Sequence, residues 1–247
     1  MLLNYIIKKK RVSIIDKTKE YITAFVELFF PRNCITCGID LFKSEKGICR
    51  KCEASLPCTY FNMVLDNPVH QIFWGRLKVE KATSLFFYRK GESLQRILKS
   101  IKYKGNVDLS VEMGRIMGRK LQKSYFFEGI DMIIPVPLHY KKFQKRGYNQ
   151  SQFLAEGMSE VTGIPVETNH LYRILDTSTQ TKKGRYERYE NIANAFKLYD
   201  SPMISGKSIL LIDDVITTGA TLEALGNTIL KGANDVKLSV VSLAYAY

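Results

Sequence analysis

The sequence predicts an α/β fold: an open, mainly parallel sheet with helices on both faces, preceded by a small cysteine-rich module. Strand-like and helical segments alternate after residue 80, and the short links between them favour parallel strands. Residues 209–212 form a continuous apolar run, as a strand covered on both faces requires. The cysteine pairs lie ahead of that alternation, within residues 34–52.

The elements are predicted in chain order. Residues 1–30 form an N-terminal helical segment, because their apolar positions follow an approximate helical stripe that stops at Pro31. The cysteine module then covers residues 31–57, residues 58–80 are aromatic and irregular, and the α/β domain spans residues 80–247. The strands expected in that domain are 83–88, 132–134, 165–168, 208–212 and 236–244. The helices expected there are 92–103, 111–125, 149–161 and 220–231.

The composition and charge of the chain indicate which kinds of binding partner it favours. The 247 residues are 45% apolar, which allows a sizeable core, and the net charge is +13, from 37 basic and 24 acidic residues. Part of the basic excess is clustered at residues 8–11, 141–146 and 182–188, which favours phosphate-rich partners over a simple role in solubility. No apolar stretch is long enough to cross a bilayer and no secretory signal is evident, so a cytoplasmic protein is expected.

Two Cys-x-x-Cys pairs predict a structural zinc site. Each pair places two thiolates on one tight turn, and four thiolates complete a tetrahedral Zn²⁺ shell. Disulfides and reduced buried thiols are the alternatives, and a reducing cytoplasm argues against disulfides. Cys58 falls outside this spacing. The expected ligands are Cys34, Cys37, Cys49 and Cys52.

Residues 209–221 are the most informative segment, because a buried strand runs into two acids, a small-residue turn and the start of a helix. The small turn allows backbone N–H groups to face an anion, and the helix that follows adds its positive N-terminal dipole. Asp213 and Asp214 would repel a phosphate but suit ribose hydroxyls or a hydrated Mg²⁺. An ordinary strand-to-helix turn is the alternative, although adjacent acids at the end of a buried strand are costly without a ligand.

Other segments are expected to complete a sugar-phosphate site, since ligands of open α/β sheets bind at the carboxyl ends of strands. Strand 132–134 runs into a proline-rich, basic loop at 135–142 that could hold pyrophosphate. In that loop, His139 could donate to pyrophosphate or could cap the loop. The polar, basic stretch at 173–191 is long for a compact domain and is predicted to be a lid; a surface loop without function is the alternative. The chain lacks G-x-x-x-x-G-K-[ST] and G-x-G-x-x-G, which disfavours P-loop and dinucleotide enzymes.

These motifs together resemble the ComF family of phosphoribosyltransferase-like proteins linked to bacterial DNA uptake. The resemblance covers roughly residues 30–247. Besides the cysteine pairs, it rests on Lys-Tyr-Lys-Gly at 102–105, PVPLH at 135–139, RGYNQ at 146–150, Arg173, Thr179-Gln180, the series Arg185, Arg188 and Asn191, and DDVITTGAT at 213–221. The chain departs from the family at Lys182-Lys183, where Gly-Leu is usual.

The resemblance implies a type I phosphoribosyltransferase-like fold that binds phosphoribosyl pyrophosphate (PRPP) with Mg²⁺, and a role in DNA uptake and natural transformation. It implies catalytic roles for Asp213, Asp214 and Arg188. The expected contacts to PRPP are Val215, Thr217, Thr218, Gly219, Ala220, Thr221, Val136, Pro137, Leu138, His139, Arg146 and Arg185.

Two functions remain open at this point. The first is a phosphoribosyltransferase, in the glycosyltransferase class, whose acceptor is not visible and for which residues 53–80 are the only candidate hood. The second is a non-catalytic, single-stranded-DNA-binding protein that uses the PRPP fold as a ligand-binding scaffold. Aromatic residues among the basic clusters could stack on bases or could equally belong to the core, and the core is expected for Phe143: Tyr103, Tyr140, Phe143, Tyr148, Tyr186 and Tyr189.

Overall fold

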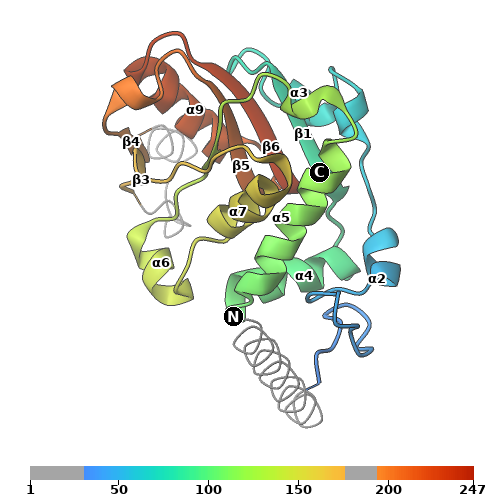
Figure 1. Ribbon diagram of the computed structural model, residues 1–247. Coiled ribbons are helices and arrows are strands. Elements are labelled where there is room, and N and C mark those ends of the chain that lie inside the picture. The colour runs from blue at the N-terminus through green and yellow to red at the C-terminus, as the bar shows by residue number, and fades with distance from the viewer. Residues whose placement is uncertain (1–30, 176–193) are drawn as a thin grey trace, which may run out of the picture.

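The computed structural model describes residues 31–175 and 194–247, and at its centre is an open sheet of parallel strands (Figure 1). The strand order is β1-β6-β5-β2, and each neighbouring pair is parallel. The strands are β1 (Lys81–Phe87), β2 (Met132–Pro135), β5 (Ser208–Ile216) and β6 (Lys237–Tyr245). The predicted sheet is therefore confirmed, and residues 1–30, with the helix predicted for them, lie outside the described residues.

Helices cover both faces of this sheet, as predicted. Side chains alternate along β5: Leu210 and Ile212 enter one core cluster, and Ile209 and Leu211 enter the other. The first cluster is covered by α4 (Ser93–Tyr103), α5 (Val107–Leu121) and α7 (Gln150–Thr162). The second is covered by α9 (Ala220–Gly232) and by α3 (Pro68–Gln71) with the turn that follows it. Burial on both sides explains why this strand is apolar without interruption.

Helices α5 and α7 lie side by side in near backbone contact (Figure 1). A Cβ placed on Gly114 would lie 2.1 Å from the carbonyl oxygen of Leu154. A Cβ on Gly157 would lie 1.9 Å from the carbonyl oxygen of Val111. Only glycine fits these two positions, and the close approach fixes where the N-terminus of α7 meets the end of β5.

Most predicted elements are confirmed within a few residues, and the exceptions have local causes. Helix α5 begins at Val107 instead of 111, because the Asn106 side chain accepts a hydrogen bond from the Leu109 N–H at 3.0 Å and caps it there. The strand predicted at 165–168 is reduced to one bridge, between Ile133 and Val166. Elements not predicted are α6 (Tyr140–Arg146), the antiparallel pair β3 (Leu171–Arg173) and β4 (Phe196–Leu198), and the 3₁₀ turns η2 (Tyr125–Phe127) and η3 (Ser201–Met203).

The cysteine segment packs directly against the helices of the first core. Cys34, Cys49 and Cys52 are buried in the same cluster as α4 and α5, and α2 (Arg50–Ala54) carries the last of them. A Cβ on Gly47 would lie 2.8 Å from Leu109 Cδ1, so the segment sits tightly on α5.

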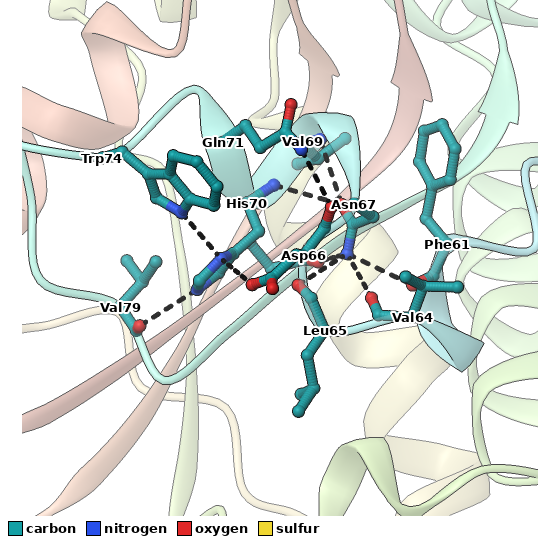
Figure 2. Close-up of polar contacts among 11 residues, drawn as sticks. Phe61, Val64, Leu65, Asp66, Asn67, Val69, His70, Gln71, Trp74 and Val79 are labelled. Carbon is teal, nitrogen blue, oxygen red and sulfur yellow. Dashed lines mark hydrogen bonds and ion pairs between the residues drawn. The ribbon is translucent and has the colours of Figure 1, made fainter.

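Residues 58–80, predicted as irregular, are organised around the polar contacts of Asn67 (Figure 2). This side chain is buried, with only 3% of Asn67 exposed. This side chain caps α3 by accepting hydrogen bonds from the N–H groups of Val69 and His70 at 3.0 and 3.1 Å. Its amide nitrogen donates to carbonyl oxygens at the end of η1 (Phe61–Met63) and on β1, at 2.8 Å to both Val64 and Ala82. One buried amide therefore ties this segment to the sheet.

None of the helices in the described ranges has the length and apolar character needed to cross a membrane.

Candidate functional site

A cleft of about 530 Å³ opens at the carboxyl ends of the parallel strands. The end of β5 contributes Asp213, Asp214 and Val215, and the turn into α9 contributes Thr217 and Thr221. The loop after β2 contributes Val136, Pro137 and Leu138. Its basic lining residues are Lys99, Lys102, Lys142, Arg146 and Arg173. The structure thus brings together most of the predicted site residues that it describes, in a basic cleft that contains two acids.

The two acids have different partners. Asp214 is buried, and its Oδ2 accepts from Lys102 Nζ at 3.0 Å and from Gln150 Nε2 at 2.9 Å. Asp213 Oδ1 accepts from the Ser151 hydroxyl at 3.1 Å and from the Asp214 N–H at 2.8 Å. Burial, together with the charge of Asp214, raises the pKa of Asp213 to about 7. A carboxylate that is difficult to ionise alone would be stabilised by a cation or by hydroxyl donors.

Lys102, Gln150 and Ser151 were not predicted as partners of the acids. The sequence singles out the segments Lys-Tyr-Lys-Gly at 102–105 and RGYNQ at 146–150, and it suggests Asn149 or Ser151 as a helix cap, but it does not indicate these contacts. Lys102 lies in the last turn of α4, whereas Gln150 and Ser151 open α7. The contacts depend on how these helices pack over β5, which no local pattern in the sequence encodes.

The turn at 217–221 has an inner and an outer side. Thr217 and Thr221 line the cleft, whereas the Thr218 carbonyl accepts from Arg76 Nη1 at 2.9 Å on the other side. Gly219 precedes α9 with φ +70°, in the left-handed region. Ala220, the first residue of α9, lines a separate groove. N–H groups in the first turn of a helix have no intrahelical acceptor, so this turn is chemically suited to an anion.

The β2 loop is fixed by α6 and α7. Asn149 caps α7 and donates from Nδ2 to the Val136 carbonyl at 3.0 Å, which holds that loop at the cleft. His139 does not line the cleft; its Nδ1 accepts from the Lys141 N–H at 3.3 Å and caps α6, in place of the rigid loop predicted there. The Arg146 guanidinium lies over the Tyr103 ring, 5.6 Å from its centroid, at the edge of the cleft.

The aromatic residues of the basic clusters divide between core and surface. Tyr148 is buried, as the core alternative has it, with its hydroxyl donating to the Ile101 carbonyl, so it cannot stack on a base. Phe143, expected in the core, is 47% exposed on α6, so that prediction is wrong. Tyr103 and Tyr140 are 69% and 65% exposed, which leaves them accessible.

The predicted lid falls almost entirely outside the described residues. Arg173, at the end of β3, does line the cleft. The other residues of this prediction lie within 176–193: Thr179, Gln180, Lys182, Lys183, Arg185, Tyr186, Arg188, Tyr189 and Asn191. The roles expected for Arg185 and Arg188 therefore stay predictions.

The four paired cysteines form a cluster that could hold a metal ion. Their sulfur atoms all lie within 4.8 Å of one another, and Cys37 Sγ is 3.8 Å from Cys49 Sγ. A tetrahedral zinc with Zn–S bonds of about 2.3 Å separates its sulfurs by about 3.8 Å. All four are free thiols in the structure, as is Cys58.

The backbone around the cluster favours thiolates at some positions. The N–H groups of Cys49 and Cys52 point at Cys34 Sγ and Cys49 Sγ, each at 3.4 Å. Burial raises the pKa of Cys34, but N–H groups led by that of Cys49 outweigh it and lower the pKa to about 6. Burial and the neighbouring thiols raise the pKa of Cys52. This donor set fits a thiophilic cation that displaces the remaining protons.

No protein-family model matches the sequence, but curated relatives do. The chain is 27% identical to "Competence protein F" of Haemophilus influenzae and 26% identical to "DNA utilization protein YhgH" of Salmonella typhi, in both cases over 85% of this chain and 96% of the relative. It is 25% identical to "Competence protein ComFC" of Bacillus subtilis, over 85% of this chain and 76% of that protein. These relatives confirm the resemblance that the motifs indicated.

Solved structures give weaker matches. Glutamine PRPP amidotransferase from B. subtilis, complexed with ADP and GMP, is 16% identical over 57% of this chain and 30% of that chain, with a TM-score of 0.39. A hypoxanthine phosphoribosyltransferase from Staphylococcus aureus is 16% identical over 55% of this chain and 62% of that chain, with a TM-score of 0.32.

Proposed function

We propose that this chain, which belongs to the ComF family, binds PRPP with Mg²⁺ in the cleft at the carboxyl ends of β2 and β5. The observation that carries the proposal is the acid pair beside the first turn of α9. Lys102 is bound to Asp214, while the pKa of Asp213 is raised by burial and by that neighbour. A ligand that brings hydroxyl donors and a cation to this pair relieves an unfavourable arrangement.

The parts of PRPP match the parts of the cleft. The 5′-phosphate would lie on the turn at 217–221, where helix N–H groups and the α9 dipole favour an anion. The ribose hydroxyls would donate to Asp213 and Asp214. The pyrophosphate would lie along the β2 loop at 136–138 beside Arg146, whose guanidinium is suited to phosphate oxygens.

The residues present also fit Mg²⁺, which prefers oxygen ligands and keeps several waters. Besides the two carboxylates, the side-chain oxygen of Gln150 is buried and has no hydrogen-bond partner among the described residues. Asp213, Asp214 and this amide would hold the ion directly or through water. Bound there, Mg²⁺ would neutralise charge on the pyrophosphate.

The reaction class that such a site supports is phosphoribosyl transfer, in which pyrophosphate leaves C1 of the ribose. The carboxylates would orient the ribose, and the basic groups of the cleft would stabilise the departing charge. Relatives named for competence and DNA utilization support a role in DNA uptake. The free thiols of the cysteine cluster fit a reducing compartment such as the cytoplasm, and we propose that the cluster holds a structural zinc ion.

Calorimetry tests the PRPP proposal. PRPP titrated into the protein with and without Mg²⁺ should bind more tightly with the ion. Replacing Asp213 and Asp214 together with Asn keeps the side-chain shapes and should weaken binding by about tenfold or more, since charge-assisted hydrogen bonds are lost. A double variant that binds PRPP as tightly as the parent would refute the assignment.

A second candidate function, single-stranded-DNA binding without catalysis, is favoured by the surface of α6. This short helix exposes Tyr140 and Phe143 together with Lys141 and Lys145, and exposed Tyr103 lies close to it through Arg146. Cations that contact phosphates and aromatic rings that stack on bases are the two requirements of such binding.

A further inference from the structure

We propose that Arg76 is a positioning residue that holds the turn at 217–221 in its phosphate-binding conformation from the side opposite the cleft. This inference rests on the proposed function, in that it assumes a phosphate is bound by this turn. Arg76 lies in the segment 58–80, which the sequence predicts to be irregular, and within residues 53–80, the candidate hood.

The segment that carries Arg76 is anchored to the sheet. Asn67 joins α3 to β1 (Figure 2). The ring of His70, which lies within α3, joins this helix to the residues that follow it. Trp74 Nε1 donates to His70 Nδ1 at 3.2 Å, and His70 Nε2 lies 3.3 Å from the Val79 carbonyl. These contacts suit the neutral ring with its proton on Nε2. The backbone on both sides of Arg76 is therefore held before any ligand arrives.

Arg76 uses this anchorage to connect three groups. Its Nη1 donates to the Thr218 carbonyl at 2.9 Å and to the Ile72 carbonyl at 3.1 Å. Its Nη2 forms an ion pair with Glu223, which lies in the first turn of α9. The Glu223 side chain is only 7% exposed. A planar guanidinium can make these contacts together, which a single ammonium group does less well.

The contact to Thr218 determines the direction of an N–H group. In a trans peptide the carbonyl and the following N–H point in opposite directions. Because the Thr218 carbonyl points toward Arg76, the Gly219 N–H points away from it, toward the side on which Thr217 and Thr221 line the cleft. Arg76 thus orients an anion-binding N–H without touching the anion.

Packing on the same side reinforces this arrangement. A Cβ on Gly219 would lie 2.5 Å from Ile72 Cγ2 and 3.1 Å from Phe73 Cε1, so the turn rests directly on this segment. Glu223 adds an electrostatic reason for Arg76, since the negative charge of this carboxylate in the first turn of α9 opposes a phosphate bound there. The ion pair removes most of that repulsion.

Two variants and one control separate the orienting role of Arg76 from its neutralisation of Glu223. Glu223→Gln removes the negative charge but keeps Arg76 on the Thr218 carbonyl. Arg76→Gln with Glu223→Gln removes both charges of the ion pair together, but the guanidinium contact to Thr218 is lost. Arg119→Gln, on the exposed part of α5, is the matched control for loss of a surface arginine.

The probes are ribose 5-phosphate, which would use the turn at 217–221, and inorganic pyrophosphate, which would use the β2 loop. Calorimetry on the full chain should show ribose 5-phosphate binding weakened about tenfold in the double variant, the effect of about one charge-assisted hydrogen bond. Pyrophosphate binding should stay within about twofold. Arg119→Gln should bind both ligands like the parent, and Glu223→Gln should bind ribose 5-phosphate at least as tightly as the parent, because a negative charge is removed while Arg76 stays on the Thr218 carbonyl. Urea unfolding of each variant establishes that the fold is retained.

The inference is overturned if the double variant binds ribose 5-phosphate like the parent, or if it loses both ligands equally, because either result means that Arg76 does not act through the turn. A parent protein that binds neither PRPP nor ribose 5-phosphate overturns the proposed function itself. Weaker binding of Glu223→Gln that matches the double variant would contradict the orienting role, since Arg76 remains in place there.

Discussion

Replacing Asp213 with Asn should stabilise the unliganded protein, and the gain should grow with pH. Burial and the charge of Asp214 raise the pKa of Asp213 from 3.8 to about 7, so the folded state holds a proton that the unfolded state releases above about pH 4. The free energy of unfolding therefore falls through the titration of Asp213 as the pH rises from about 4 to 7. Asn has no proton to release, and its side-chain oxygen still accepts the hydrogen bond from Ser151.

The size of the effect follows from the same shift. A pKa raised from 3.8 to about 7 corresponds to at most about 4 kcal/mol above pH 7, since each pH unit contributes about 1.4 kcal/mol. Asp213 is partly exposed and its charge is shared with a neighbouring acid, so about 2 kcal/mol is the expected gain at pH 8. At pH 5 most of the gain should be absent.

Urea unfolding of the parent and Asp213→Asn at pH 5 and pH 8 measures this difference. Titration of the cysteine cluster affects both proteins equally and cancels in the comparison. Equal stabilities at pH 8, or a gain that is as large at pH 5 as at pH 8, would refute the claim that the empty cleft carries an unfavourable acid pair.

Other predictions follow from the same structure. Cys49→Ser should abolish zinc binding and expose the segment 31–57 to protease, because metal binding and local folding are coupled; a full equivalent of zinc in that variant would contradict the site. Gly157→Ala should destabilise the protein by about 2 kcal/mol or more in urea unfolding, because the added methyl group meets a backbone carbonyl of α5, and an unchanged midpoint would show that α5 and α7 do not pack this closely. Lys141→Ala with Lys145→Ala should make single-stranded-DNA binding less sensitive to salt. The slope of the logarithm of the binding constant against the logarithm of salt concentration should fall in magnitude by about 1.4, the value for two phosphate contacts. Lys237→Ala, at the start of β6 and so at the end of the strands opposite the cleft, should leave that slope unchanged, and equal slopes in all three proteins would exclude α6 as the contact surface.

The sequence predicted those parts of the molecule that depend on neighbouring residues. The apolar run before Asp213, the two acids and the small turn lie within one short segment, and the structure places them at the end of β5 as expected. Periodicity also located the sheet and its main helices. The start of helix α5 was predicted four residues too late, because the cap formed by the Asn106 side chain sets it and the apolar pattern does not.

What the sequence did not predict depends on packing between distant segments. Lys102 reaches Asp214 only because α4 lies over the end of β5, and Arg76 reaches Thr218 only because Asn67 folds an aromatic, irregular segment against the sheet. Strands β3 and β4 have three residues each, which is too short for a periodic signal. Phe143 was expected in the core from its type alone, but α6 is too short to bury both sides.

The measurement that tests the central claim most directly is a crystal structure of the full chain with PRPP and Mg²⁺. The account predicts the 5′-phosphate on the N–H groups of the turn at 217–221, the ribose hydroxyls on Asp213 and Asp214, and the pyrophosphate along the loop at 136–138. PRPP bound at another surface, or an ordered cleft that stays free of ligand at saturating PRPP and Mg²⁺, would contradict it.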